Sequence, residues 1–455
     1  MNLFKPVDMT KGEPVKVIIL FTIPMLIGNV AQQLYNTVDS IIVGRFVGDN
    51  ALAAVGSAGP ILNLMLVLFM GIATGAGIMV SQYYGARQRD ELSRTIGACI
   101  TSTIVASIVI MAIGPFIARP LLNLLNTPES IIEWCNQYLT IIFLGAAGGG
   151  LYNILSGVLR GLGDSVSALI YLLVATVLNI ILDYVFVAIM GMGVAGVAWA
   201  TIIAQFVSAA LSLWKLTRMQ TIFDLKKEYL IPESFYINKL VHLGLPSGVT
   251  QAIFSMSMIV VQSLTNSFGE LFIAANVIVM RIDGFVMLPA FSFGAAMTTF
   301  AGQNIGAKQM NRVLDGAKKG TLAAMGISAV LTGLILVLGK HLMAIFTDTE
   351  ELITLSNNMM RIIAVGYILM EVTQCLSGIM RGAGDTVTPM WISIISSVAL
   401  RIPLAYGLVW LSKTPELPQG NCAMMYVSML ISWTCGALMT FFMYQKGNWK
   451  RRAIF

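Results

Sequence analysis

The chain has 455 residues, of which 57% are apolar and only 11% are charged, and its formal net charge is +6. Soluble domains carry about 25% charged residues, so this composition excludes an ordinary soluble enzyme or binding module. The basic residues lie between apolar runs and do not cluster on one soluble segment, which argues against a nucleic-acid partner. We therefore predict an all-α integral membrane protein that contacts membrane lipids.

Hydropathy predicts twelve membrane-spanning helices, because each apolar run reaches the length of about 20 residues that a bilayer requires. The first six cover residues 15–44, 52–81, 95–118, 132–157, 166–189 and 194–214. The second six cover residues 239–267, 272–302, 318–340, 353–378, 387–411 and 421–445. This division predicts an N-lobe (1–214, helices 1–6), a cytoplasmic linker (215–238) and a C-lobe (239–455, helices 7–12).

Two similar segments in each half reveal an internal repeat. LSGVLRGLGDS at 155–165 returns as LSGIMRGAGDT at 376–386, and SQYYGARQ at 81–88 returns as GQNIGAKQ at 302–309. Both pairs are offset by 221 positions (376 − 155 and 302 − 81). Six helices per copy is an even number, so both copies enter the membrane from the same side and form parallel repeats. A tandem repeat in so apolar a chain indicates a two-lobed transporter.

The distribution of basic residues predicts the orientation. Of the 28 lysines and arginines, 21 fall in connections on the side of the N-terminus and three fall inside apolar segments. Four fall on the opposite side, namely Arg45, Arg119, Lys340 and Lys413. Cytoplasmic loops carry the excess of positive charge, so we expect both termini in the cytoplasm and the chain in the cytoplasmic (inner) membrane.

Two acids lie inside the predicted helices of the first half. Gln32, Asn36 and Asp39 form one polar stripe on helix 1, and Asn179 and Asp183 share a face of helix 5. An ionisable side chain at membrane depth costs at least a few kcal/mol, which makes it a functional candidate. The alternative is that each acid separately hydrogen-bonds a neighbouring helix and has a structural role.

The two acids are expected at a similar depth. At 1.5 Å per residue, Asp39 and Asp183 each lie roughly 7–11 Å inside the outer end of their helices. Helix 6 runs inward from about residue 194, so Thr201 reaches a similar level. Asp39, Asn179, Asp183 and Thr201 together supply the hard oxygen ligands that a small cation prefers. A pair of neighbouring carboxylates also suits proton binding and release. We predict these four as the cation- or proton-coupling residues, and as the metal ligands if the ion is sodium.

The second half lacks this chemistry, because Val260 and Leu404 stand 221 positions after the two acids. Its deep polar residues are Arg281, Asp283, Glu371 and Arg401. Structural pairing explains the arginines as well as a transport role does, whereas Glu371 has only Gly150 as its counterpart. We assign Glu371 to a candidate substrate cavity, with three residues of helix 1: Gln32, Tyr35 and Asn36.

Three further features have simpler interpretations. Pro24 and Pro246 each remove a backbone hydrogen bond from the first helix of a copy and could permit a kink. The glycines at Gly145 and Gly148 to Gly150 suggest close packing or bending in helix 4. Several methionines of the second half could line an adaptable apolar pocket, although lipid contact and packing explain most of them: Met256, Met258, Met280, Met287 and Met297.

Taken together, these motifs make the chain resemble the multidrug and toxic compound extrusion (MATE) transporters, in the prokaryotic branch with DinF-like and MepA-like members. The resemblance covers nearly the whole chain. It includes NTVDSIIVG at 36–44, NIILD at 179–183, the QxxGA turns after helices 2 and 8, and the RGxGD turns after helices 4 and 10.

The resemblance implies a proton- or sodium-coupled antiporter that exports amphipathic, often cationic compounds by alternating access. Such a transporter is not an enzyme and needs no cofactor besides the coupling ion, and we expect it to be a monomer. The family's N-lobe cation site maps onto Asp39, Asn179, Asp183 and Thr201. Acids that NorM-like members carry in helices 7 and 10 are replaced here by Phe254 and Met370, so coupling is expected to rest on the N-lobe. The alternatives are a flippase for lipid-linked glycan precursors and a membrane sensor without transport.

Overall fold

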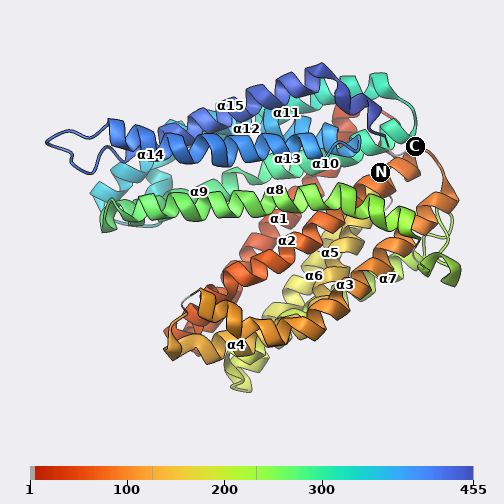
Figure 1. Ribbon diagram of the computed structural model, residues 1–455, viewed down its shortest axis with the longest axis horizontal. Helices are drawn as coiled ribbons and strands as arrows, with labels where there is room; N and C mark the ends of the chain where they lie inside the picture. The colour runs from red at the N-terminus through yellow and green to blue at the C-terminus, as the bar shows by residue number, and fades with distance from the viewer. Residues whose placement is uncertain (1–5, 126, 232, 454–455) are drawn as a thin grey trace. The chain divides into compact units, whose positions relative to one another are not determined.

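The computed structural model describes residues 6–125, 127–231 and 233–453, which form helices and connecting turns with no β-strand among them (Figure 1). The first half contains α1 (Pro14–Phe46), α2 (Asp49–Gly85), α3 (Arg89–Leu124), α4 (Glu129–Leu144), α5 (Ala146–Gly161), α6 (Ser165–Asp183), the π-helical η1 (Tyr184–Ile189), α7 (Gly193–Thr217) and η2 (Lys227–Leu230). The second half contains α8 (Ser234–Asn266), α9 (Glu270–Val286), α10 (Leu288–Gly306), α11 (Met310–Ala344), α12 (Glu350–Gly382), α13 (Val387–Ile394), the π-helical η3 (Ile395–Leu400), α14 (Arg401–Leu411), α15 (Ala423–Lys446) and η4 (Asn448–Arg451).

The helices have the lengths and the surface of membrane spans. Among the described residues 11 are long and apolar enough to cross a membrane, or 12 if α4 and α5 together form one bent span. Large apolar side chains such as Phe116 and Val337 are exposed on their outer faces, as expected for contact with lipid. The prediction of an all-α, multi-pass membrane protein is confirmed.

The fourth span is broken at a glycine. The axes of α4 and α5 differ by 54°, and Gly145 separates the two helices. A Cβ atom at Gly145 would lie 2.2 Å from the side chain of Ile202 in α7, so only glycine fits there. The predicted bending and close packing at this glycine cluster are thus confirmed.

The described chain forms two compact units whose boundaries fall inside α1 and α8. Unit 1 holds residues Ile23–Gly248 together with the short stretch that ends at Asp8, and unit 2 holds Met9–Thr22 and the chain from Val249 onward. This division differs from the sequence-based lobes at two places. The first part of α1 belongs to unit 2, and the first part of α8 belongs to unit 1. Pro24 and Pro246 each lie within two or three positions of a boundary.

Local contacts explain why residues Met9–Thr22 belong to unit 2 and why the start of α8 belongs to unit 1. In unit 2, the backbone N–H of Met9 donates to Gln303 Oε1 at 3.0 Å, and Asn304 Nδ2 donates to the Met9 carbonyl at 3.1 Å. In unit 1, the start of α8 meets α2 so closely that a Cβ atom at Gly71 would lie 2.8 Å from the carbonyl oxygen of Gly244.

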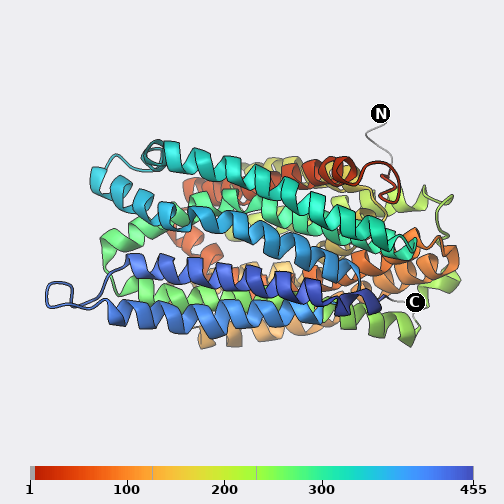
Figure 2. The ribbon, with the colours of Figure 1, turned by 90° about the horizontal axis from the view of Figure 1, so that it is seen from above.

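The repeat is visible in the helix packing of each unit. In unit 1, α5 packs against α2, α3 and α7. In unit 2, α12 packs in the same way against α10, α11 and α15, and Figure 2 shows α11, α12 and α15 running alongside one another. The same helix pairs thus form twice, once in each repeat.

Glycines of the repeated RGxGD segments make these contacts possible. A Cβ atom at Gly157 would lie 2.5 Å from the carbonyl oxygen of Ala73, and one at Gly378 would lie 2.3 Å from that of Gly294. The two pairs are offset by 221 positions (378 − 157 and 294 − 73). Lipid chains are as apolar as side chains, so such close backbone contact is what holds membrane helices together.

The ends of the repeated segments form equivalent turns. Gly163 and Gly384 have φ values of 87° and 95°, which a side chain would strain. Asp164 then caps α6 by accepting from the backbone N–H of Ser167 at 2.9 Å, and Asp385 accepts from that of Thr388 at 3.1 Å. These acids therefore initiate the next helix.

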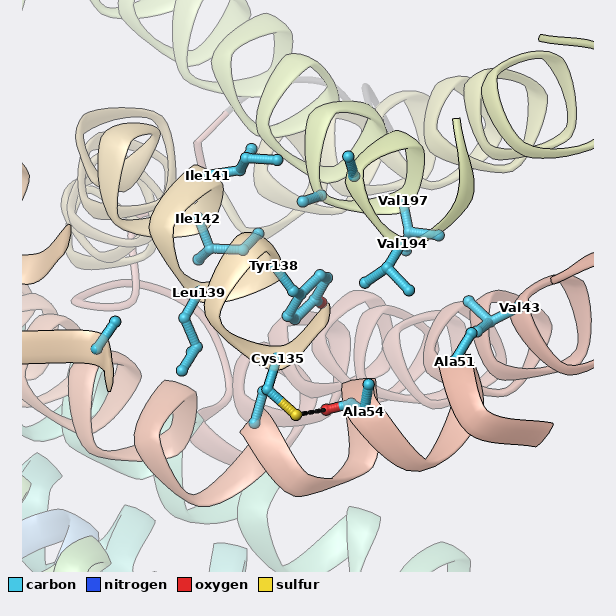
Figure 3. Close-up of a cluster of buried hydrophobic side chains, with 14 of the residues drawn as sticks. Val43, Ala51, Ala54, Cys135, Tyr138, Leu139, Ile141, Ile142, Val194 and Val197 are labelled. Atoms are coloured by element: carbon cyan, nitrogen blue, oxygen red, sulfur yellow. Dashed lines mark hydrogen bonds between the residues drawn. The ribbon is translucent and has the colours of Figure 1, made fainter. Parts of the chain in front are cut away.

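A core cluster of unit 1 packs around the buried face of α4 along most of its length (Figure 3). Cys135 donates from its Sγ to the Ala54 carbonyl at 3.3 Å, and Tyr138 points into the same cluster. Apolar residues of α1, α2 and α7 complete it, among them Val43, Ala51, Val194 and Val197. This packing fixes the position of Tyr138, one turn of helix from Cys135.

Candidate functional site: a buried carboxyl pair in unit 1

Three helices of unit 1 bring the four predicted coupling residues together. α1 carries Asp39, α6 carries Asn179 and Asp183, and α7 carries Thr201. Asn179 and Asp183 have no exposed surface, while Asp39 and Thr201 are half-buried. The spacing of four residues on α6 places Asn179 one turn above Asp183 on the same face, as the sequence predicts.

The two carboxyl groups lie close enough to share a hydrogen bond. Two carboxylates can make such a bond only when one of them carries a proton, and otherwise they repel each other. Asp39 Oδ1 and Asp183 Oδ1 have no hydrogen-bond partner among the described residues. Buried oxygen atoms are normally bonded, so these two atoms are available to a proton or a small cation.

The neighbouring amide and hydroxyl groups orient the pair. With its amide nitrogen toward the acid, Asn179 donates to Asp183 Oδ2 at 3.0 Å and accepts from the backbone N–H of Thr201 at 3.2 Å. This orientation is favoured because a carboxylate can only accept. The hydroxyl groups of Tyr35 and Thr201 lie 3.3 Å apart.

Two tyrosines of the site were missed by the sequence reasoning. Tyr138 of α4 is buried and close enough to interact electrostatically with Asp39 and Asp183. Tyr152 of α5 is near Tyr35. A tyrosine in an apolar helix has no distinguishing pattern, and only the packing of α4 and α5 shows which face it occupies.

A small cavity adjoins Tyr35 and Thr201, which neighbour the pair. It has a volume of about 40 Å³, and its walls include Gln32, Tyr35, Tyr152, Thr201 and Gln205. A buried water needs roughly 10–15 Å³ measured in this way, so the cavity has room for a few water molecules. Gln32 and Tyr35 thus line a cavity that is too small for a full-sized organic substrate, and their role in a substrate cavity stays a prediction.

A second cavity continues from Tyr152. It has a volume of about 50 Å³ and is lined by polar groups of Asn29, Tyr152, Ser156 and Arg160 as well as by Pro24. Tyr152 lines both cavities, so a series of polar side chains runs from Thr201 through Tyr152 to Arg160. Arg160 is the first residue of the RGxGD turn.

The remaining candidates for the substrate cavity lie elsewhere. Asn36 is exposed and does not line the small cavity beside the acids. Glu371 of α12 is 1% exposed inside unit 2, and its Oε2 atom has no hydrogen-bond partner among the described residues. The neighbouring Met370, not Glu371, lines a cavity of about 100 Å³ together with Phe254 and Arg381.

A π-helical segment follows the site directly. α6 ends at Asp183 and η1 begins at Tyr184. Short π-helical stretches in α-helices are frequent at functional sites, because the extra residue in the turn shifts the faces of the flanking helix. Chemically, the site can hold one proton between two carboxyl groups, or one small cation among carboxylate, amide and hydroxyl oxygens.

Comparisons with known proteins identify the family. The MatE family model matches residues 24–185 and again 246–407, once in each repeat. The chain is 31% identical over 453 residues to the probable multidrug resistance protein YpnP of Bacillus subtilis, covering 99% of each chain. It is 24% identical to the probable multidrug resistance protein NorM of Thermotoga maritima, covering 96% of this chain and 94% of that one.

Solved structures agree in fold. A multidrug resistance MATE family transporter of the MOP superfamily in an outward-facing conformation has a TM-score of 0.89, with 22% identity and 97% of each chain covered. The resemblance noted in the sequence is thus confirmed, and the chain belongs to the MATE family of membrane transporters, which are not enzymes.

Proposed function

We propose that the chain is an antiporter that exports amphipathic, often cationic compounds in exchange for protons or sodium ions, by alternating access. Relatives named multidrug resistance proteins support export of drug-like compounds. The observation that carries the coupling is the buried pair of Asp39 and Asp183 with two unbonded carboxyl oxygens. An acid in a membrane helix is costly and usually marks an ion or proton pathway.

The pair would couple transport through its charge. A proton or sodium ion that enters from outside neutralises part of the charge of Asp39 and Asp183, and Asn179 and Thr201 orient the acids around it. Release of the ion on the cytoplasmic side restores the repulsion between the carboxylates. Ion binding can then change the equilibrium between two conformations, provided that the ion binds one of them more tightly.

The two small cavities support a route for protons within unit 1. Water molecules in the cavity beside Tyr35 and in the next one, beside Arg160, would bridge polar groups that are otherwise too far apart to exchange a proton. Tyr152 lines both cavities and would connect them. The Arg160 end would face the cytoplasm, and the excess of basic residues on that side, 21 against four, supports this orientation. The protein would work as a monomer in the cytoplasmic membrane.

Uptake of a fluorescent cation such as ethidium into inverted vesicles tests this proposal. One arm applies a proton gradient alone and a second applies a sodium gradient alone. We expect one gradient to drive uptake into vesicles with the wild-type protein. Asp39→Asn and Asp183→Asn should each abolish it, because a neutral amide removes the coupling charge. Asp49→Asn, which changes an exposed acid at the start of α2, serves as the matched control and should keep full uptake.

Three outcomes would contradict the proposal. The first is wild-type uptake in both acid variants, which would remove the pair from the mechanism. The second is uptake that needs neither gradient. The third is the absence of uptake under either gradient while the purified protein is folded.

A further inference from the structure

Unit 2 contains a larger cavity than those beside the acids. Its volume is about 260 Å³, and all of its lining residues belong to α8, α9, α12, α14 and α15 of that unit. Drug-sized ligands occupy pockets of about 300–1,000 Å³ with mostly apolar walls and a few polar groups. Four methionines line this cavity: Met258, Met280, Met425 and Met429. Their flexible side chains can adapt to ligands of different shapes.

Arg401 presents an incompletely bonded guanidinium to this cavity. Its side chain lines the cavity although the residue is only 8% exposed. The hydrogen bond that it makes is to the Met429 Sδ atom at 3.5 Å, and a thioether is a weak acceptor. Among the described residues, no carboxylate oxygen lies within ion-pair distance of Arg401. A buried cation with so few partners is costly unless an anionic group completes its bonding.

Asp283 lies on another wall of the same cavity. The Tyr367 hydroxyl donates to Asp283 Oδ1 at 2.8 Å and holds the carboxylate in place. Asp283 and Arg401 interact electrostatically but do not form an ion pair. A purely structural pair would close to direct contact, because direct contact offsets the cost of removing both charges from water. Here the two charges line the cavity from separate helices, α9 and α14.

Local structure places Arg401 at this position. The π-helical η3 ends at Leu400, and α14 begins with Arg401. The unit 1 acid Asp183 likewise borders a π-helical segment, on its N-terminal side. Each unit thus has a buried charged residue at the end of a π-helical turn, a type of segment that is frequent at functional sites.

We infer that this cavity of unit 2 binds amphipathic zwitterions, with the ligand's carboxylate on Arg401, its ammonium or N–H group toward Asp283, and its apolar body against the methionines. A ligand that is only a cation would be repelled by Arg401, and one that is only an anion would be repelled by Asp283. A zwitterion satisfies both side chains, and a guanidinium can bind a carboxylate through two parallel hydrogen bonds. The inference rests on the proposed function in one respect, namely that zwitterions are cargo as well as the cations that the proposed function names.

Three probes with the same indole ring separate the charge requirements. Tryptophan is a zwitterion, tryptamine is a cation, and indole-3-propionate is an anion. Binding to the purified full-length protein is measured by isothermal titration calorimetry and by the ligand-induced shift of the thermal unfolding midpoint. We expect the wild-type protein to bind tryptophan more tightly than either tryptamine or indole-3-propionate.

Variants of the two charged residues then assign the contacts. Arg401→Gln should weaken tryptophan binding roughly 10- to 100-fold, as expected for loss of a hydrogen bond between charged groups. Arg401→Lys keeps the charge and should restore part of the affinity. Asp283→Asn should remove the preference for tryptophan over indole-3-propionate. Arg281→Gln changes an exposed arginine on the same helix as Asp283 and should have no effect.

The result is decisive in either direction. Absence of tryptophan binding to the wild-type protein would overturn the inference, as would equal binding of tryptamine, or an affinity that Arg401→Gln leaves unchanged. Binding at equilibrium needs no ion gradient, so Asp39→Asn should retain it. Loss of gradient-driven uptake together with intact tryptophan binding would therefore contradict the proposed antiport but not this site.

Discussion

Asp39 of α1 and Asp183 of α6 place their carboxyl groups within hydrogen-bonding reach of each other inside unit 1. Each acid has one oxygen atom with no partner among the described residues. If the pair binds one proton or cation, as we propose, the interaction between two helices that are far apart in the sequence would change. This relationship connects the charge state of the site to the packing of α1 against α6.

The hydroxyl of Thr201 gives the first prediction. Thr201→Val keeps the shape of the side chain but removes the oxygen that lies 3.3 Å from the Tyr35 hydroxyl. If this oxygen is an ion ligand, the half-saturating concentration of the coupling ion should rise roughly 10-fold, with little change in the maximal rate of uptake. Thr176→Val is the matched control, because Thr176 lines the same cavity but donates to its own helix at Leu172. Equal effects of the two substitutions would contradict a ligand role for Thr201.

Much of the first site could be predicted from the sequence, because helix geometry is regular. The spacing of Asn179 and Asp183 determines that they share a face, and counting residues from the helix ends gives the depth of Asp39 and Thr201. Regular geometry cannot say which faces of different helices meet. Tyr138 and Tyr152 therefore escaped prediction, since their positions depend on the packing of α4 and α5 and on the break at Gly145.

The cavity of unit 2 shows the same limit more clearly. Arg401, Asp283 and Glu371 are all recognisable as costly residues in apolar segments, and the sequence favours Glu371 among them. Arg401 and Asp283 meet at one cavity, whereas Glu371 does not line it. The π-helical turn of η3 shifts the face that Arg401 presents, and this irregularity has no clear sequence pattern.

The close contact at Gly378 gives a second prediction. Gly378→Ala would place a methyl group 2.3 Å from the carbonyl oxygen of Gly294, and backbone cannot move aside as a flexible side chain can. We expect a loss of stability of about 1–3 kcal/mol, as is typical of overpacking, measured by thermal unfolding in detergent. Gly326→Ala in α11 meets no atom within 4 Å and should be neutral or slightly stabilising. Unfolding at the same temperature in both variants would show that α10 and α12 are not held together at this glycine.

The linker ahead of α8 gives a prediction for acidic pH. Arg89 binds Asp224 through two hydrogen bonds, of 3.0 Å from Nε and 2.9 Å from Nη2. This contact lowers the pKa of Asp224 below its usual range. A carboxyl group with a lowered pKa stabilises the fold fully above its ordinary pKa and loses that contribution as the pH falls through the lowered value.

Hydrogen exchange of residues 218–231, corrected for the intrinsic effect of pH, measures this docking. Protection should persist at pH 5 and decline below about pH 4, where carboxyl groups begin to protonate. Asp224→Asn should reduce protection at every pH, and Glu228→Gln, an exposed change in the same segment, should leave the profile intact. A wild-type profile in Asp224→Asn would mean that the ion pair does not hold the linker, since exposed pairs can contribute nothing measurable.

The prolines near the unit boundaries give the last prediction. α1 passes from unit 2 to unit 1 between Thr22 and Ile23, and α8 passes from unit 1 to unit 2 between Gly248 and Val249. Pro24 and Pro246 lie beside these boundaries and leave a helical hydrogen bond unmade. Both helices must bend there if the units move as separate bodies during alternating access.

Pro24→Ala and Pro246→Ala should therefore slow transport by stiffening the two helices. We expect turnover at saturating substrate to fall several-fold, while ion affinity and thermal stability remain at or above those of the wild-type protein, since alanine restores a helix hydrogen bond. Pro60→Ala is the matched control, because Pro60 lies inside α2, which belongs wholly to unit 1. If Pro60→Ala slowed transport as much as Pro246→Ala, the effect would belong to helix prolines in general, and bending at the unit boundaries would not limit the transport cycle.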